Sequence, residues 1–142
     1  MPSIRGIVET AISVRDVRAS AEWYRRLFGF KPLLEGERLV ALAVGAEDVL
    51  LIFTAGGTSE PFPTPGGVIP GHAGGGVSHL AFAMEPADVA AWRARLAGEG
   101  VTVESAVDWP GGAQSLYFRD PDGHLVELIT PGFWRSGNEQ KV

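Results

Sequence analysis

Cysteine is absent from the 142-residue sequence, which excludes disulfides, thiolate metal sites and cysteine nucleophiles. Long apolar runs are absent too, since no stretch approaches the roughly 18 residues that a membrane-spanning helix needs. The N-terminal MPSIRGIVET lacks the basic segment and apolar run of a secretory signal. We therefore expect a protein that does not bind a membrane and that works in the cytoplasm.

Positive charge is scarce, with 12 Lys and Arg against 17 Asp and Glu and a net charge of −5. The densest basic cluster is the pair Arg25 and Arg26, which is too little for the basic footprint of a nucleic-acid-binding surface. Phosphate-loop, dinucleotide and nucleophile motifs are missing, because GHAGGG lacks the lysine and the helix that follow a phosphate loop. A small molecule or another protein is the expected partner, and we favour a small-molecule substrate.

The chain repeats one order of elements. From Glu9, a short alternating strand precedes a helix in RDVRASAEWYRRLFGF, whose apolar residues follow helical spacing and whose end is marked by Gly29. Three strand-like runs follow: KPLLE, RLVALAVG and DVLLIFT. From His79 the order recurs as HLAFAM, a helix in EPADVAAWRARLAGEG with Pro86 near its first turn, and then VTVESAV, QSLYFRD and GHLVELIT. Two copies of strand–helix–strand–strand–strand are predicted.

The connection between the two copies is rich in glycine and proline. Residues 55–77 contain eight glycines and four prolines, a composition that excludes a helix or a central strand. We expect a loop that partly covers a pocket, because long irregular connections are often functional. The predicted organisation is one domain over 1–142, with a first module (5–54), this connection, a second module (78–131) and a tail (132–142).

Three stretches resemble the vicinal oxygen chelate superfamily, also called the glyoxalase, bleomycin-resistance and extradiol-dioxygenase superfamily. They are AISVRDVRASAEWYRRLFGF, VSHLAFAM and YFRDPDGHLVELIT, within a likeness that runs from about Val8 to Thr130. The first helix ending in LFGF, together with DPDGH followed by an apolar strand with a glutamate, is specific for the superfamily but not for one member. The resemblance implies an α+β fold in which two βαβββ modules curl a mixed sheet around a cleft, in a homodimer.

Members of this superfamily commonly hold a divalent metal on the first and last strands of the modules. Carried over position by position, the resemblance implies metal ligands at Glu9, His79 and Glu127. Laying LIT of the second module over IFT of the first places Leu51 where a fourth ligand would stand. Glyoxalase I enzymes have a carboxylate there, so Leu51 argues against that activity. Because many members have histidine in place of Glu9, the ion is left open among Fe, Mn, Zn, Ni and Co.

The alternation of the strands supports the same three residues independently. In both first strands a polar residue, Glu9 or His79, shares its face with small residues, and the opposite face carries large apolar ones. Glu127 lies on an otherwise apolar face. Two carboxylates and an imidazole suit a divalent transition metal, and sharing the ion removes the cost of burying each carboxylate alone. Three ligands leave room for a substrate that chelates through two oxygens.

Each of these residues also has a simpler interpretation. Taken singly, Glu9 is typical of a solvated strand residue and His79 of a hydrogen-bonded core histidine. In that case the pocket would hold no metal. Because the residues stand at matched positions of the repeat, we favour the shared metal site.

Three further residues are candidates for acid, base or orienting roles. Tyr117 and Arg119 alternate with apolar residues, so their shared face could line the cleft, although an ion pair with an aspartate of the following turn is an equal alternative for Arg119. His72, in the glycine-rich connection, could contact the substrate or could be an exposed loop residue. His124 lies on the opposite face from Glu127 and is expected to be a turn residue.

Aromatic and apolar residues are expected to bind the substrate. Leu51 and Phe53 share one strand face, and Trp109, in DWPGGAQ, is predicted to stand at the mouth of the pocket. Phe133 and Trp134 of the tail need cover from the cleft or from a second subunit.

The favoured function is a metal-dependent enzyme acting on a small oxygen-chelating substrate, of lyase, isomerase, epimerase or ring-cleaving dioxygenase type. The alternative is a dimeric binding protein of the bleomycin-resistance type, which would sequester a flat aromatic compound without metal chemistry. A weaker third interpretation is a metal-dependent transferase acting on fosfomycin, for which the sequence has no obvious cation-binding loop.

Overall fold

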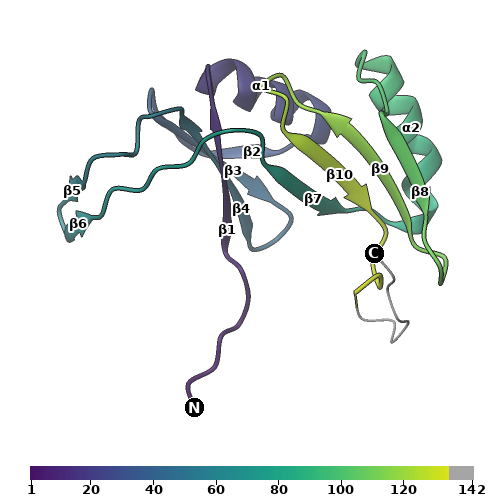
Figure 1. Cartoon of the computed structure of the whole chain (residues 1–142), viewed down its shortest axis with the longest axis horizontal. Helices are drawn as coiled ribbons and strands as arrows, with labels where there is room; N and C mark the ends of the chain where they lie inside the picture. Colours follow the sequence, from purple (N-terminus) through teal and green to yellow (C-terminus); the bar gives the residue numbers. More distant parts are fainter. Residues whose placement is uncertain (135–142) are drawn as a thin grey trace. The chain divides into compact units, whose positions relative to one another are not determined.

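The computed structural model describes residues 1–134, so positions 135–142 of the predicted tail lie outside the described residues. The chain divides into two compact units, Met1–Gly76 and Val77–Val142. Each unit contains one four-stranded mixed sheet and one α-helix (Figure 1). In the described part of the chain, no helix is long and apolar enough to span a bilayer.

The first unit begins with the predicted βαβββ order. Its elements are β1 (Glu9–Val14), α1 (Val17–Phe28), β2 (Lys31–Glu35), β3 (Leu39–Val44), β4 (Asp48–Thr54), β5 (Phe62–Thr64) and β6 (Gly67–Ile69). The short strands β5 and β6 form an antiparallel hairpin inside the glycine-rich connection. Sequence composition excluded a central strand there but did not predict this hairpin, whose two three-residue strands tolerate proline because they belong to no larger sheet.

Local sequence explains the limits of α1. The Asp16 carboxylate accepts hydrogen bonds from the backbone N–H groups of Arg18 and Ala19, each 3.0 Å long, and so caps the helix start. Gly29 ends the helix at φ 74°, a left-handed conformation that favours glycine. The buried stripe of α1 includes Tyr24, which is fully buried, and faces β3 and β4.

The second unit repeats the order. Its elements are β7 (His79–Ala83), the 3₁₀ turn η1 (Pro86–Asp88), α2 (Val89–Gly98), β8 (Ser105–Asp108), β9 (Gln114–Arg119) and β10 (Leu125–Ile129). The helix predicted over residues 85–100 therefore opens with a 3₁₀ turn, consistent with the position of Pro86. The strand predicted over 101–107 begins only at Ser105.

The two sheets have one topology. The strand order is β1-β4-β3-β2 in the first sheet and β7-β10-β9-β8 in the second. The pairs β1–β4 and β7–β10 are parallel, and all the other pairs of these two sheets are antiparallel. The predicted α+β fold of two βαβββ copies is thereby confirmed.

The strand register shows which residues of the two units are equivalent. Ala11 pairs with Leu51 across β1 and β4, and Ala81 pairs with Glu127 across β7 and β10. Glu9 and His79 each stand two residues before those alanines. Leu51 therefore occupies, relative to Glu9, the place that Glu127 occupies relative to His79.

Burial follows the expected alternation in both first strands. Ile12 and Val14 of β1 are buried while Glu9 and Ala11 are exposed, and in β7 Leu80 is buried while His79 is exposed. Helix-facing positions thus build the core of each unit, and the polar residues point to the open face of the sheet.

Candidate metal centre and apolar pocket

The first unit has an apolar pocket of about 760 Å³ over the open face of its sheet. Four residues singled out in the sequence line it: Glu9, Leu51, Phe53 and His72. The rest of the lining comes from Ala11 of β1, from β2 and β3, and from the hairpin and the adjoining loops, and it includes Leu34, Leu39, Phe62, Ile69 and Pro70. The glycine-rich connection therefore contributes walls to a pocket that Glu9 also lines.

His72 is held against this pocket by its own backbone. Its N–H donates to the Thr58 carbonyl at 2.8 Å, and its carbonyl accepts from the Thr58 hydroxyl at 2.7 Å. Its imidazole meets the Phe53 ring edge-on, with centroids 5.3 Å apart. The loop histidine is thus placed beside a predicted substrate-binding residue, although its side chain remains exposed.

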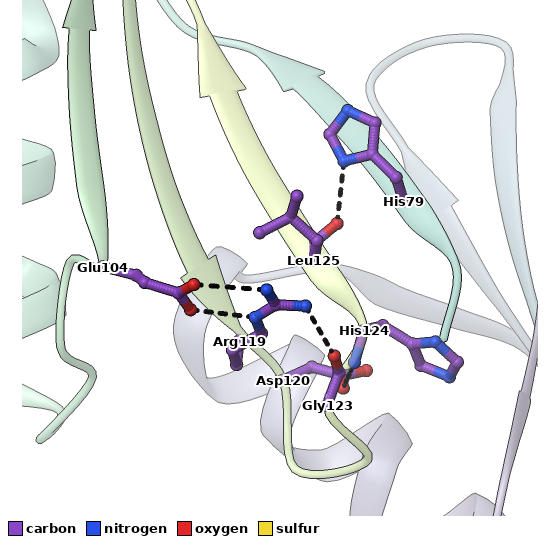
Figure 2. A network of polar contacts seen from close by, with 7 residues as sticks. All are labelled: His79, Glu104, Arg119, Asp120, Gly123, His124 and Leu125. Atoms are coloured by element: carbon purple, nitrogen blue, oxygen red, sulfur yellow. Dashed lines mark hydrogen bonds and ion pairs between the residues drawn. The ribbon is translucent and has the colours of Figure 1, made fainter. Parts of the chain in front are cut away.

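The second unit brings His79 and Glu127 together. Nε2 of His79 lies 3.2 Å from Oε2 of Glu127. Nδ1 of His79 lies 3.1 Å from the Leu125 carbonyl (Figure 2). A carbonyl only accepts hydrogen bonds, so Nδ1 carries the proton, and Nε2 faces the carboxylate either with a lone pair or with a second proton.

Glu127 is almost fully buried, with 6% of its surface exposed. Its Oε1 accepts a 2.5 Å hydrogen bond from the hydroxyl of Ser115, which is itself buried. Tyr117 pairs with Glu127 across β9 and β10, and its ring centroid lies 6.3 Å from that of His79. Three of the residues expected near the chemistry, His79, Tyr117 and Glu127, are therefore neighbours.

The pKa of Tyr117 is raised above its usual range. Burial contributes most, because it disfavours the phenolate, and the hydrogen bond to Glu127 and the negative charge of that carboxylate act in the same direction. The hydroxyl of Ser115 opposes the shift. Tyr117 accordingly remains a protonated hydrogen-bond donor at neutral pH.

Trp109 lies in a tight turn between β8 and β9. Its backbone N–H donates to the Ala113 carbonyl at 2.8 Å, and its carbonyl accepts from Gly112 at 3.0 Å. Its indole N–H donates to the Ser115 hydroxyl at 2.8 Å, and its ring packs on Phe133 with centroids 4.6 Å apart. Phe133 is thereby buried, whereas Trp134 is 78% exposed.

Arg119 is engaged in an ion pair with Glu104, on the segment that leads into β8. Its Nε and one terminal nitrogen contact the two carboxylate oxygens at 2.9 and 3.2 Å, and its other terminal nitrogen donates to the Gly123 carbonyl at 3.1 Å (Figure 2). The guanidinium lowers the pKa of Glu104 through its hydrogen bonds and its charge. The partner of Arg119 is thus Glu104, and not the aspartate of the following turn that the sequence suggested.

The DPDGH turn orders the strands that carry His79 and Glu127. The Asp120 carboxylate accepts from the backbone N–H groups of Asp122 and His124, at 3.0 and 2.8 Å. The buried imidazole of His124 accepts from the N–H of Ser78 at 2.9 Å through Nδ1. His124 therefore ties the start of β7 to the start of β10.

The donor geometry in the second unit fits a divalent cation. Two ligand atoms bound to one dication at about 2.0–2.2 Å lie roughly 3.0–3.4 Å apart, which includes the separation between His79 and Glu127. A metal-binding histidine usually donates its other N–H to a carbonyl or carboxylate, as His79 does to Leu125. Within the described residues of each unit, no group of three His, Asp or Glu side chains gathers as a complete ligand set. Glu9 belongs to the first unit, and its role as third ligand stays a prediction.

Sequence reasoning missed Ser115 and Glu104. Ser115 could have been found from strand parity, because it stands two residues before Tyr117 and hence on the same face. No comparable signal identified Glu104, which lies outside a regular strand.

The chain belongs to the Glyoxalase/Bleomycin resistance protein/Dioxygenase superfamily, whose family model matches residues 6–128. The match spans both βαβββ units, and it confirms the resemblance found in the sequence.

Among curated proteins, the metallothiol transferase FosB of Shouchella clausii (strain KSM-K16) is 28% identical over 131 residues, covering 89% of this chain and 81% of the relative. Among solved structures, lactoylglutathione lyase from Agrobacterium tumefaciens is 31% identical, with a TM-score of 0.85 and coverage of 94% and 99%. The fosfomycin resistance protein FosX from Listeria monocytogenes, solved with Mn(II) and sulfate, shares the fold at 20% identity, with a TM-score of 0.68 and coverage of 92% and 94%.

Proposed function

We propose that this protein is a divalent-metal-dependent enzyme acting on a small substrate that chelates through two oxygens. The single observation that carries the proposal is the contact between His79 and Glu127, in which a buried carboxylate meets an imidazole whose other nitrogen is occupied. Without a cation or a second proton, two lone pairs would face each other at 3.2 Å.

The ligands would be His79 and Glu127, with Glu9 as the third, and the ion would be Fe, Mn, Zn, Ni or Co. Such an ion would act as a Lewis acid that polarises the substrate oxygens. Tyr117 would donate a hydrogen bond to the substrate or protonate it, since it stays protonated and lies beside Glu127.

The pocket of the first unit supports a substrate with an apolar body. Glu9, Leu51 and Phe53 all line it, so a molecule held at Glu9 would place its apolar part against Leu51 and Phe53. His72, beside Phe53, would contact the same part of the substrate. Trp109 belongs to the second unit, where it would act through its indole N–H, which donates to Ser115.

The reaction would be of lyase, isomerase, epimerase, transferase or dioxygenase type. The printed names of the relatives, metallothiol transferase and lactoylglutathione lyase, favour an enzyme over a binding protein that only sequesters a compound. Lactoylglutathione lyase activity itself is disfavoured, because Leu51 stands where the resemblance requires a carboxylate.

A cytoplasmic homodimer is the expected form. Strand β2 is an edge of its sheet and exposes Leu33 and Leu34 at 62% and 53%, which a second subunit would cover. Light scattering at micromolar concentration should give twice the chain mass, and a monomer would contradict this expectation.

A matched pair of variants tests the metal site. Glu127→Ala removes a ligand and should weaken metal binding by about 100-fold or more, because even loss of an outer hydrogen-bond partner commonly costs 10- to 100-fold. Leu51→Ala, at the equivalent place of the first unit, should bind metal as the unaltered protein does. Both are measured by calorimetry and by elemental analysis, with circular dichroism to confirm folding. Full metal retention by folded Glu127→Ala would refute the assignment.

A further inference from the structure

Three residues of the second unit form a directed hydrogen-bond chain. Indole N–H groups only donate, so the Ser115 oxygen is the acceptor from Trp109. The single hydroxyl proton of Ser115 is then directed to Oε1 of Glu127 at 2.5 Å. The hydrogen bonds run from the indole through the hydroxyl to the carboxylate, and the phenol of Tyr117 lies beside both Ser115 and Glu127.

The hydrogen bond from Ser115 occupies Oε1 of Glu127 and leaves Oε2 directed to Nε2 of His79. Since Glu127 and Ser115 are 6% and 1% exposed, bulk water does not substitute for the hydroxyl. A hydrogen bond to a charged acceptor in such a buried place is stronger than one at the surface.

We propose that Ser115, oriented by Trp109, is a positioning residue that holds Glu127 so that only Oε2 is presented, beside His79, to a divalent cation. The inference rests on the proposed function, since it concerns the carboxylate of that same site. With Oε1 occupied, Glu127 uses one coordination position instead of two, and a position is kept for a substrate oxygen.

The orientation of the Trp109 indole is fixed by packing and by the backbone of its turn. Phe133 packs on Trp109 and is 6% exposed, and the turn at residues 109–113 is closed by two backbone hydrogen bonds. Trp109 thus cannot turn its N–H away from Ser115 without losing this packing. The segment after β10 thereby supports the orientation of Glu127.

The test uses the full chain and cobalt(II) alone. Ser115→Ala should raise the dissociation constant of cobalt(II) by about 10- to 100-fold. It should also change the visible absorption bands of the bound ion, because the freed Oε1 becomes available as a second donor. Ser105→Ala is the matched control, since Ser105 is an exposed serine on β8 of the same sheet. It should leave both the affinity and the spectrum unchanged.

Trp109→Phe separates the hydrogen bond from the packing. It keeps a ring against Phe133 and removes only the N–H, so cobalt(II) affinity should fall by about threefold to tenfold. Because Trp109 acts through Ser115, the double variant should bind cobalt(II) like Ser115→Ala alone. Fully additive losses would overturn this order of action and show that the indole N–H of Trp109 affects cobalt(II) binding by a route other than Ser115.

The positioning role of Ser115 and the metal site itself are contradicted by different results. Unchanged affinity and an unchanged spectrum in folded Ser115→Ala would overturn the positioning role while leaving the metal site intact. Absence of cobalt(II) binding by the unaltered protein would overturn both proposals. Retention of the unfolding transition by each variant is checked by circular dichroism before titration.

Discussion

The two units share one topology and one register but have opposite chemistry on their open sheet faces. In the second unit the face carries His79, Glu127, Tyr117 and Ser115, joined by hydrogen bonds and close contacts. In the first, the place of Glu127 is taken by Leu51 in an apolar pocket. Duplicated backbone therefore does not imply duplicated function. The second copy gathers polar side chains on its open face, and the first forms an apolar pocket that also includes Glu9.

The difference between the two open faces arises from side chains at equivalent positions of the strands. Tyr117 pairs with Glu127, and the corresponding partner of Leu51 is Ala41. A carboxylate at the position of Leu51 would face Ala41 and would lack the tyrosine that stands opposite Glu127. Apolar residues at these positions allow the first unit to accept the apolar part of a ligand.

Glu9 is the charged residue of β1. Its replacement should change ligand binding more than the other substitutions that distinguish the two units, and the quantity affected is the affinity for metal. Glu9→Gln removes the charge but keeps the shape, so metal affinity should fall by about 10- to 100-fold if the first unit contributes a ligand. Glu37→Gln is a suitable control, since Glu37 lines the same pocket but lies outside β1. Calorimetric titration measures both. Equal affinities in the two variants would confine the metal site to the second unit.

The apolar pocket should respond to Phe53→Ala. Removing this ring should weaken binding of the neutral fluorophore N-phenyl-1-naphthylamine by about tenfold, or about 1.4 kcal/mol, because apolar contact area is lost. Metal affinity should stay the same. Fluorescence titration provides the measurement.

Val68→Ser is the control for this experiment. Val68 is 65% exposed on β6 and does not line the pocket, so the fluorophore should bind that variant normally. Equal loss in both variants would place the fluorophore on the general apolar surface rather than in the pocket.

The smallest expected effect concerns Tyr117 at high pH. Its folded-state pKa lies above the unfolded value, so the folded protein binds more protons and the free energy of unfolding falls as pH rises above about 10 through the raised pKa. Below the unfolded pKa the contribution of Tyr117 to the free energy of unfolding is constant. Tyr117→Phe removes it, and stability should then decline less steeply between pH 9 and 12.

Urea unfolding in the presence of a chelator measures this difference for both proteins. Parallel pH profiles would show that the phenol of Tyr117 is not perturbed by its neighbours. A change that appears only below pH 9 would point to a group other than Tyr117.

Much of the molecule could be predicted from local patterns. Helical spacing and the Gly29 stop predicted α1, because capping and amphipathicity act within a few residues. Strand alternation placed Glu9 and His79 on open faces for the same reason. The repeat of elements, combined with the family resemblance, predicted the fold.

Other features depended on tertiary structure. The β5–β6 hairpin escaped prediction because proline and glycine obscure strand signals. Ser115 reaches Glu127, and Arg119 reaches Glu104, across 12 and 15 residues of sequence. Such contacts depend on strand register and turn geometry, which no local pattern specifies.

The sequence by itself determined the order of the elements, the faces of the strands and the residue types available for a metal site. Only the tertiary structure decided that His79 meets Glu127 at 3.2 Å and that hydrogen bonds link Trp109 through Ser115 to that carboxylate. The physical reason is range. Backbone dihedral preferences and alternation act between near neighbours in sequence, whereas a site is made by side chains that folding brings together from distant strands.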